Sequence, residues 1–264
     1  MSKNLIIGFA VNLCANKESM TNFCISLRKY YEENVVLLTD TNDQDFIDYL
    51  KSFKVKVFKT SQHITIEDMM IQRWALPMKV IEAFPEAENI ILSDTRDVVY
   101  QDNPFKYLVG NELELTTEVK YIRECPDWNS RWIRDMYGEE VLRSVLDQKI
   151  ICGGYMCGKK EGVIKLCQLM VEESKNYPKT IPGQPPVFVD QAAMNVFYKQ
   201  NKFPSTTIHY TGGEFIATIG ATLGPMKLND EGYVVNEAGY KTAVIHQYDR
   251  HPNIVKAFND RLRV

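Results

Sequence analysis

Two aspartates stand three positions apart directly after an apolar segment in the first half of the chain. Asp94 and Asp97 follow the run Ile90–Ser93. Two carboxylates at this spacing can converge on one hard cation, and oxygen ligands suit Mg²⁺ or Mn²⁺. Such an ion can hold both phosphates of a nucleotide diphosphate and stabilise it as a leaving group. An acidic turn that caps the following segment would give the same pattern. The aspartate pair alone is therefore consistent with a metal site and with a cap.

A second cluster of polar residues follows an apolar segment near the end of the chain. It runs from His246 to His251 and contains Arg250. A neutral imidazole can be a third metal ligand, and its nitrogen favours Mn²⁺ over Mg²⁺. The planar guanidinium of Arg250 can pair with a phosphate. The alternative is a surface turn with a structural histidine.

Two further segments carry groups that could act on a substrate. Asp190 and Gln191 begin a predicted helix behind a Pro- and Gly-rich segment, residues 178–186. A carboxylate there could be a base, a nucleophile or a ligand of a sugar hydroxyl, although it could also cap the helix. Arg73 stands beside Trp74 on the helix predicted before the aspartate pair. It could reach a diphosphate or simply be an exposed helical arginine.

The elements predicted around these residues alternate between strand and helix. Strands are predicted at 5–13, 35–39, 55–58 and 89–93, and helices at about 20–31, 46–53 and 67–84. This order favours a mostly parallel sheet flanked by helices. Ligands of such sheets bind at the carboxyl ends of the strands, which is where Asp94 falls.

The second half of the chain is less regular. Strands are predicted at 114–122, 150–156 and 242–246, and helices at 139–146, 162–174, 190–200 and 253–262. The pair Gly153-Gly154 interrupts the second of these strands. No linker separates the halves, so one α/β domain is the better prediction for 264 residues.

Composition excludes several classes of partner. The net charge is −3 and no block of like charge stands out, so no nucleic-acid partner is expected. No segment approaches the roughly 20 apolar residues of a membrane span. The apolar run at 5–13 slightly resembles a signal peptide but fits a buried first strand better. The six cysteines form no C-x-x-C pair and predict buried free thiols in a reducing, cytoplasmic compartment.

Taken in order, these motifs resemble a known family. The segment 94–99 after its apolar strand, followed by Asn103-Pro104-Phe105, resembles the aspartate (DxD-type) motif of GT-A glycosyltransferases. The strand at 150–156 is similar to the small-residue strand on their acceptor side. Residues 190–195 are similar to the D-Q-x-x-L-N helix of family 8-like members, and His246 stands where a late histidine completes their metal site. The spacing of Asp94 and Asp97 departs from Asp-x-Asp by one residue.

The resemblance implies a single GT-A (Rossmann-like) catalytic domain over residues 1–264. Residues 1–105 would form the nucleotide-sugar-binding half, and residues 106–264 the acceptor-side half with a smaller mixed sheet. The implied reaction moves a hexosyl or pentosyl group from a UDP- or GDP-type donor to a hydroxyl of a glycan or glycoconjugate. It would depend on Mn²⁺ or Mg²⁺ and leans toward retention.

The resemblance also implies roles for individual residues. Asp97, His246 and Asp94 would hold the metal, with Asp94 an alternative contact of the donor sugar or ribose. The donor would contact residues from several elements, namely Phe9, Ala10, Arg73, Asp94, Arg96 and Arg250. Gly153 and Gly154 would face the acceptor, and Asp190 and Gln191 would be catalytic.

Other functions share parts of this pattern. A sugar nucleotidyltransferase would have a glycine-rich loop after its first strand, whereas residues 13–17 contain no glycine. A phosphatase would need an Asp-x-Asp-x-Thr strand. A catalytically inactive carbohydrate-binding GT-A-like protein would keep the fold but not hydrolyse nucleotide sugars.

Overall fold

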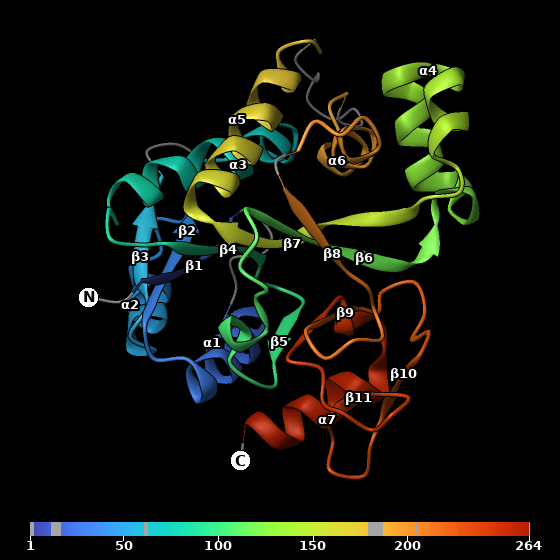
Figure 1. The fold of residues 1–264 in the computed structure, drawn as a ribbon. Coiled ribbons are helices and arrows are strands. Elements are labelled where there is room, and N and C mark those ends of the chain that lie inside the picture. Colours follow the sequence, from blue (N-terminus) through green and yellow to red (C-terminus); the bar gives the residue numbers. More distant parts are fainter. Residues whose placement is uncertain (1–2, 12–16, 61–62, 179–186, 204, 264) are drawn as a thin grey trace.

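The computed structural model describes residues 3–11, 17–60, 63–178, 187–203 and 205–263. Within these ranges a ten-stranded mixed sheet crosses the molecule, and a two-stranded antiparallel sheet lies outside it. Helices α3 (Ile66–Glu82), α5 (Lys160–Ser174) and α6 (Asp190–Lys199) lie over one face of the large sheet (Figure 1). Helices α1 (Lys17–Tyr30) and α2 (Gln44–Ser52) lie over the other face. The predicted α/β class is confirmed. The sheet combines parallel and antiparallel pairs, so the predicted mostly parallel GT-A arrangement is not confirmed for the sheet as a whole.

The first half of the chain builds the parallel part of the sheet. Four strands occur in the order β3-β2-β1-β4: β1 (Asn4–Phe9), β2 (Asn34–Thr39), β3 (Lys56–Lys59) and β4 (Asn89–Asp94). Three helices connect them: α1 (Lys17–Tyr30), α2 (Gln44–Ser52) and α3 (Ile66–Glu82). All three strand pairs are parallel. The alternating order predicted for this half is confirmed.

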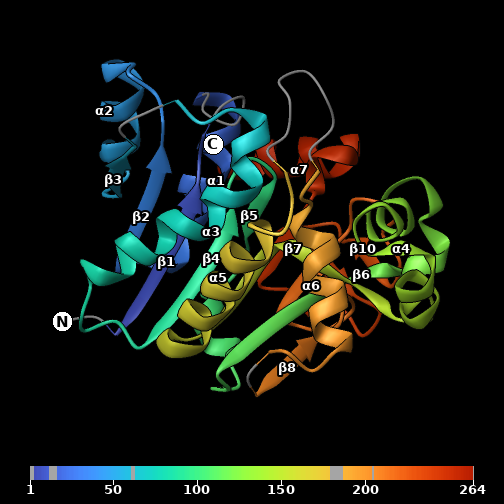
Figure 2. The ribbon, with the colours of Figure 1, turned by 90° about the horizontal axis from the view of Figure 1, so that it is seen from above.

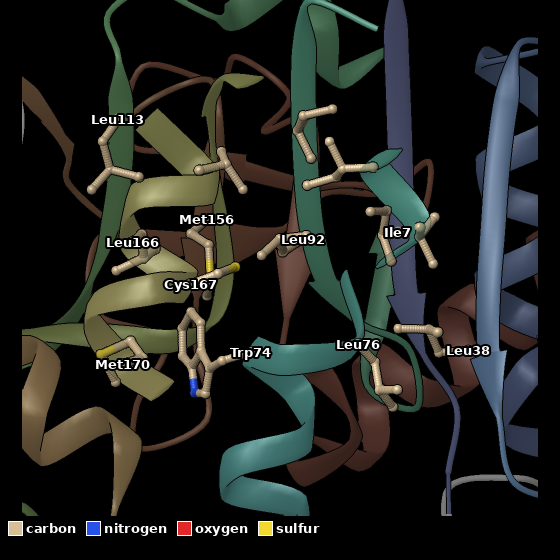
Figure 3. Close-up of a cluster of buried hydrophobic side chains, with 14 of the residues drawn as sticks. Ile7, Leu38, Trp74, Leu76, Leu92, Leu113, Met156, Leu166, Cys167 and Met170 are labelled. Atoms are coloured by element: carbon tan, nitrogen blue, oxygen red, sulfur yellow. The ribbon is translucent and has the colours of Figure 1, made fainter. Parts of the chain in front are cut away.

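Strand β1 is buried on both faces, which explains its unbroken apolar sequence. Successive side chains of a strand point to opposite faces. Leu5 and Ile7 therefore pack in the core that contains Trp74 of α3, and Ile6 packs in the core that contains Phe23 of α1. Figure 3 shows the first of these cores.

Strands from the second half extend the sheet beyond β4. They are β7 (Lys149–Lys159), β6 (Leu113–Tyr121), β8 (Thr206–His209), β9 (Ile216–Thr218) and β12 (Val244–His246). They are joined by β5 (Val98–Tyr100), which belongs to the first half. Strand β7 is antiparallel to both β4 and β6. Strand β5 ends the strand order. Only residues 95–97 separate it from β4, so the far end of the sheet must fold back toward β4.

The remaining helices complete the layers. They are α4 (Arg131–Val145), α5 (Lys160–Ser174), α6 (Asp190–Lys199) and α7 (Pro252–Leu262). Helix α4 changes direction at Gly138, whose φ of 84° favours glycine. The sequence predicted only the part after Gly138. Figure 2 shows α5 between α3 and α6, with α4 beyond α6.

Some predictions fall outside the described residues. These are the end of the first predicted strand at 12–13, most of the Pro- and Gly-rich segment, and most of residues 13–17, on which the nucleotidyltransferase alternative depends. The small separate sheet pairs β10 (Met226–Leu228) with β11 (Val234–Asn236). In the described part of the chain, every helix is too short or too polar to cross a membrane.

Candidate metal centre and the adjoining cavity

Strand pairing brings three distant segments together at one point. Strand β4 ends at Asp94, and β5 begins at Val98. Strand β12 pairs antiparallel with β5 so that His246 lies opposite Val98, one residue from Asp97. The backbone N–H of Gln247 donates to the carbonyl of Asp97 at 2.8 Å, which ties the two strand ends together. The backbone therefore places a histidine beside two aspartates.

The side chains of these residues form a compact cluster. Asp94, Asp97 and His246 each offer one ligand atom, and the three atoms lie within 4.8 Å of one another. His246 Nε2 is 3.6 Å from Asp94 Oδ2 and 3.7 Å from Asp97 Oδ1, which is longer than a hydrogen bond. This nitrogen is buried and has no hydrogen-bond partner among the described residues. Such an orphaned atom between two carboxylates fits a metal ligand, and two oxygens with one nitrogen suit Mn²⁺ or Mg²⁺.

The other ring nitrogen of His246 is already held. Nδ1 lies 3.3 Å from Thr218 Oγ1 and 3.3 Å from Cys152 Sγ. Thr218 is the residue of β9 directly opposite His246 in the sheet. We infer the tautomer with its proton on Nδ1, because Thr218 can accept it and Nε2 then presents its lone pair to the carboxylates. The orientation of the ring is thus fixed by neighbouring strands.

Arg73 connects the cluster to helix α6. Its Nη2 donates to Asp94 Oδ1 at 2.8 Å and to the carbonyl of Gly153 at 2.7 Å, and its Nη1 lies 3.4 Å from Asp190 Oδ2. Trp74 Nε1 also donates to Asp190 Oδ2, at 3.2 Å. The buried carboxylate of Asp190 therefore lies behind Arg73. Helix α6 begins at Asp190 after Val189, so Asp190 is not the residue that caps it.

Arg96 holds the second oxygen of Asp97. Its Nη2 donates to Asp97 Oδ2 at 3.0 Å, and its Nη1 is ion-paired with Asp249. The first oxygen of Asp97, Oδ1, is left facing His246. Arg96 was predicted to bind the donor, and the structure places it at the rim of the cluster with its guanidinium partly exposed.

The two aspartates of the cluster have opposite pKa shifts. Burial would raise the pKa of Asp94, but Arg73 and His246 hold it below its usual value. Burial raises the pKa of Asp97, with His246 opposing the shift. Burial likewise raises the pKa of Asp190, and Arg73 offsets this only in part. A bound divalent cation would favour the ionised form of both ligand carboxylates.

The two glycines of β7 lie against this cluster, but only one of them is required there. Strand β7 pairs with β4 so that Tyr155 is opposite Ser93, which places Gly154 beside Asp94. A Cβ on Gly154 would lie 2.6 Å from both Asp94 Oδ2 and His246 Nε2. A Cβ on Gly153 would meet only Gln191, at an ordinary 3.5 Å. A side chain at position 154 would therefore displace Asp94 or His246.

Helix α6 supplies hydrogen bonds that strand β4 cannot. The β4–β7 pairing ends at Tyr155, so the preceding residues of β7 lack a partner on that side. Asn195 Oδ1 accepts from the N–H of Ile151 at 2.8 Å, and its Nδ2 donates to the carbonyl of Ile151 at 3.1 Å. Gln191 Oε1 accepts from the N–H of Gly153 at 3.0 Å. Because Gln191 and Asn195 are four residues apart, they share one helix face.

A cavity of about 550 Å³ adjoins the cluster. Gln191 lines this cavity, and its Nε2 donates to two other lining residues, to Glu118 Oε1 at 2.9 Å and to Asn129 Oδ1 at 3.0 Å. The lining comes from β6, the short helix Pro126–Ser130, α4, α6 and the loops next to β9 and β12: Glu118, Lys120, Cys125, Trp128, Asn129, Trp132, Gln191, Ala221, Gln247 and Arg250. Arg250, predicted to bind phosphate, lies in this lining.

Sequence reasoning identified only Gln191 and Arg250 among the cavity residues. Glu118 lies in a segment that simply alternates as a strand does, and nothing distinguishes it there from a solvated residue. The sequence feature that could have indicated the cavity is the pair Trp128 and Trp132, which are four residues apart and follow the predicted strand 114–122. Thr218 lies in a strand of only three residues, too short to show a pattern.

Phe9 and Ala10, predicted to hold the nucleoside, lie at the end of β1. Phe9 is opposite Asp94 in the parallel pairing, and its carbonyl accepts from Thr95 Oγ1 at 2.9 Å. Ala10 is fully buried, and its N–H donates to the carbonyl of Leu38 at 2.8 Å. Phe9 is thus one strand from the cluster, whereas Ala10 offers no exposed surface to a ligand.

No protein-family model matches the chain, and no curated protein matches it either. The function is therefore inferred from the geometry of the cluster and the cavity.

Proposed function

We propose that this protein is a metal-dependent glycosyltransferase with a GT-A topology. It would move a hexosyl or pentosyl group from a UDP- or GDP-type sugar to a hydroxyl of a glycan or glycoconjugate. The observation that carries the proposal is the orphaned Nε2 of His246 between the carboxylates of Asp94 and Asp97. The cluster lies at the carboxyl end of β4, where α/β sheets bind their ligands.

The surroundings of the cluster suit a diphosphate leaving group. A divalent cation held by Asp97, His246 and Asp94 would stabilise the charge that develops on the diphosphate. Arg73 and Arg96 add positive charge on two sides of the carboxylates. Phe9 at the end of the adjacent strand supports a nucleoside position nearby. Gly154 allows β7 to approach Asp94 and His246 more closely than a residue with a side chain could.

The protein groups on the other side of the cluster suit the sugar. Gln191 lies between Gly153 and Glu118, so it connects the cluster with the cavity. Asp190 acts through Arg73, which it contacts, rather than from the cavity lining. In this arrangement the donor sugar would lie near Gln191, and the acceptor would enter from the cavity.

Calorimetry with UDP and GDP, each with and without Mn²⁺, tests the proposal. We expect Mn²⁺-dependent binding of one nucleotide and loss of most of it in Asp97→Asn, because the substitution removes a charged ligand from a site with few ligands. Asp260→Asn is the matched control, since Asp260 is an exposed partner of Lys256 on α7. Unchanged affinity in Asp97→Asn would exclude the proposed role of Asp97.

A second measurement separates an enzyme from an inactive binding protein. Nucleotide-sugar donors should be slowly hydrolysed to the nucleotide diphosphate and free sugar in the presence of Mn²⁺. Asp97→Asn should abolish this hydrolysis, and Asp260→Asn should retain it. Mn²⁺-dependent nucleotide binding without any hydrolysis would favour the inactive alternative.

A further inference from the structure

The cavity next to the metal cluster has an aromatic wall open to solvent. Trp128 is 57% exposed, which is unusual for so large an apolar side chain. Its ring lies 5.8 Å from that of Trp132, centroid to centroid, and Arg131 covers part of it at 5.4 Å. Both tryptophans line the cavity. An exposed aromatic surface at a concave site provides a stacking surface for a ligand.

The rest of the lining is polar and of mixed charge. Gln191 Nε2 bonds both Glu118 and Asn129, so these three side chains form one network in the cavity lining. Lys120 and Arg250 add positive charge near Glu118. Burial raises the pKa of Glu118, and the hydrogen bond from Gln191 and the nearby cationic groups offset this only in part. The cavity therefore offers donors and acceptors together, with one carboxylate and two cationic side chains.

This combination discriminates between ligand classes. A pyranose has a flat face of C–H groups that can stack on an indole, and a rim of hydroxyls that each donate and accept hydrogen bonds. A phosphorylated ligand could pair with Lys120 and Arg250, but it would also place its charge near Glu118 and make no use of the indole face. A purely apolar ligand would bury the charges of Glu118, Lys120 and Arg250 without partners, which is costly. The volume of about 550 Å³ is within the range of small-molecule sites.

We propose that this cavity binds a saccharide, with one sugar ring stacked on Trp128 and a hydroxyl held by Glu118. If the proposed transferase function holds, the saccharide is the acceptor. Only this assignment as acceptor rests on the proposed function; the binding of a saccharide does not. Glu118 is opposite Thr218 in the sheet, and Thr218 contacts His246. A hydroxyl at Glu118 therefore lies close to the metal cluster, on the side reached by Gln191.

Binding of defined disaccharides, measured without nucleotide or metal, tests the inference. The probes are cellobiose, maltose, lactose, xylobiose and chitobiose, with sorbitol as a non-cyclic control. Binding is measured by saturation-transfer NMR and by tryptophan fluorescence. We expect saturable binding of at least one disaccharide and at least about fivefold weaker binding in Trp128→Ala, with a smaller loss in Trp128→Phe. Tyr240→Ala is the matched control, because Tyr240 is equally exposed at 60% but lies outside the lining.

Alkylation of Cys125 locates the bound saccharide. Cys125 lines the cavity and is partly exposed, whereas the other described cysteines are buried. We expect the bound disaccharide to slow maleimide labelling of the peptide that contains Cys125, as measured by mass spectrometry. Labelling of Cys125 at the same rate with and without saturating saccharide would place the sugar elsewhere and overturn the proposal.

The result is separable from that of the proposed function. If no disaccharide binds, or Trp128→Ala binds as the wild type does, the saccharide site is wrong even where Mn²⁺-dependent nucleotide binding is found. If a disaccharide binds and depends on Trp128 but no nucleotide binds with Mn²⁺, the saccharide site stands and the transferase proposal fails.

Discussion

The metal cluster and the aromatic cavity are neighbours, but they are built in opposite ways. The ligands of the cluster lie at the ends of paired strands, and His246 is only 1% exposed. Each ligand is also held by a second group: His246 by Thr218, Asp94 by Arg73 and Asp97 by Arg96. The cavity is lined largely by residues of short helices and loops, and Trp128 lies in solvent.

The two sites should therefore differ in how sensitive they are to substitution. A buried cluster of charges holds its geometry only if every contacting atom fits, so small changes there should have large effects. An open cavity gains its affinity from stacking and a few hydrogen bonds, so single substitutions should weaken binding without abolishing it. Substitution of Trp128 tests the open cavity, and substitution of Gly154 tests the buried cluster.

The largest effect is expected from a single methyl group at Gly154. In Gly154→Ala the new Cβ would overlap Asp94 and His246, so we expect Mn²⁺ affinity to fall by roughly 100-fold or more. Gly153→Ala is the matched control one residue away, since its Cβ meets Gln191 at an ordinary distance. Titration of both variants with Mn²⁺, with thermal melts to confirm folding, makes the comparison. Equal affinities in the two variants would show that the ion does not lie between Asp94 and His246.

A smaller effect is expected at Asp190, one layer behind the cluster. Asp190→Asn removes the charge that faces Arg73 but leaves every metal ligand in place. We expect donor turnover to fall by roughly 10–100-fold, with the affinity for Mn²⁺ and nucleotide nearly unchanged. Asp260→Asn is the control, because it is the same substitution at an exposed residue of α7 that is paired with Lys256 and lies outside the cluster. A loss on the order of 10²–10⁴-fold would instead indicate that the carboxylate touches the sugar, and unaltered turnover would exclude both roles.

The sequence predicted the cluster better than it predicted the cavity, for a physical reason. Asp94 was found because buried parallel strands are long apolar runs, and the polar residue after such a run marks the ligand-binding edge. His246 was found by the same logic after a late apolar strand. Their contact required the antiparallel pairing of β12 with β5, which no local pattern shows.

The cavity depends on features that leave no periodic signal. Glu118 belongs to a strand predicted correctly in outline, but its role follows from the side chain of Gln191, which lies 73 residues away. Strand β9, which carries Thr218, has three residues, fewer than a period-2 pattern needs to stand out. The prediction for Gln191 was also incomplete, because its bond to the N–H of Gly153 follows from the point where β4 stops pairing with β7.

The most gradual effect is expected from pH. Burial by itself would lower the pKa of His246, but the sulfur of Cys152 and the carboxylates of Asp97 and Asp94 raise it well above the ordinary 6.5. In the metal-free protein His246 therefore keeps its proton to a higher pH than it would in the unfolded chain. Its favourable contribution to stability is fully present below about pH 6.5 and is lost as the pH rises through the folded pKa.

Metal binding should show the opposite trend, because a proton on Nε2 must leave before an ion can bind there. With one proton displaced, Mn²⁺ affinity should rise by up to about tenfold per pH unit below the folded pKa of His246 and level off above it. Calorimetric Mn²⁺ titrations between about pH 6 and 9 would measure this slope, and His246→Gln should flatten it because the amide does not titrate. A slope in the wild type that persists unchanged in His246→Gln would mean that the displaced proton comes from Asp97, whose pKa burial also raises.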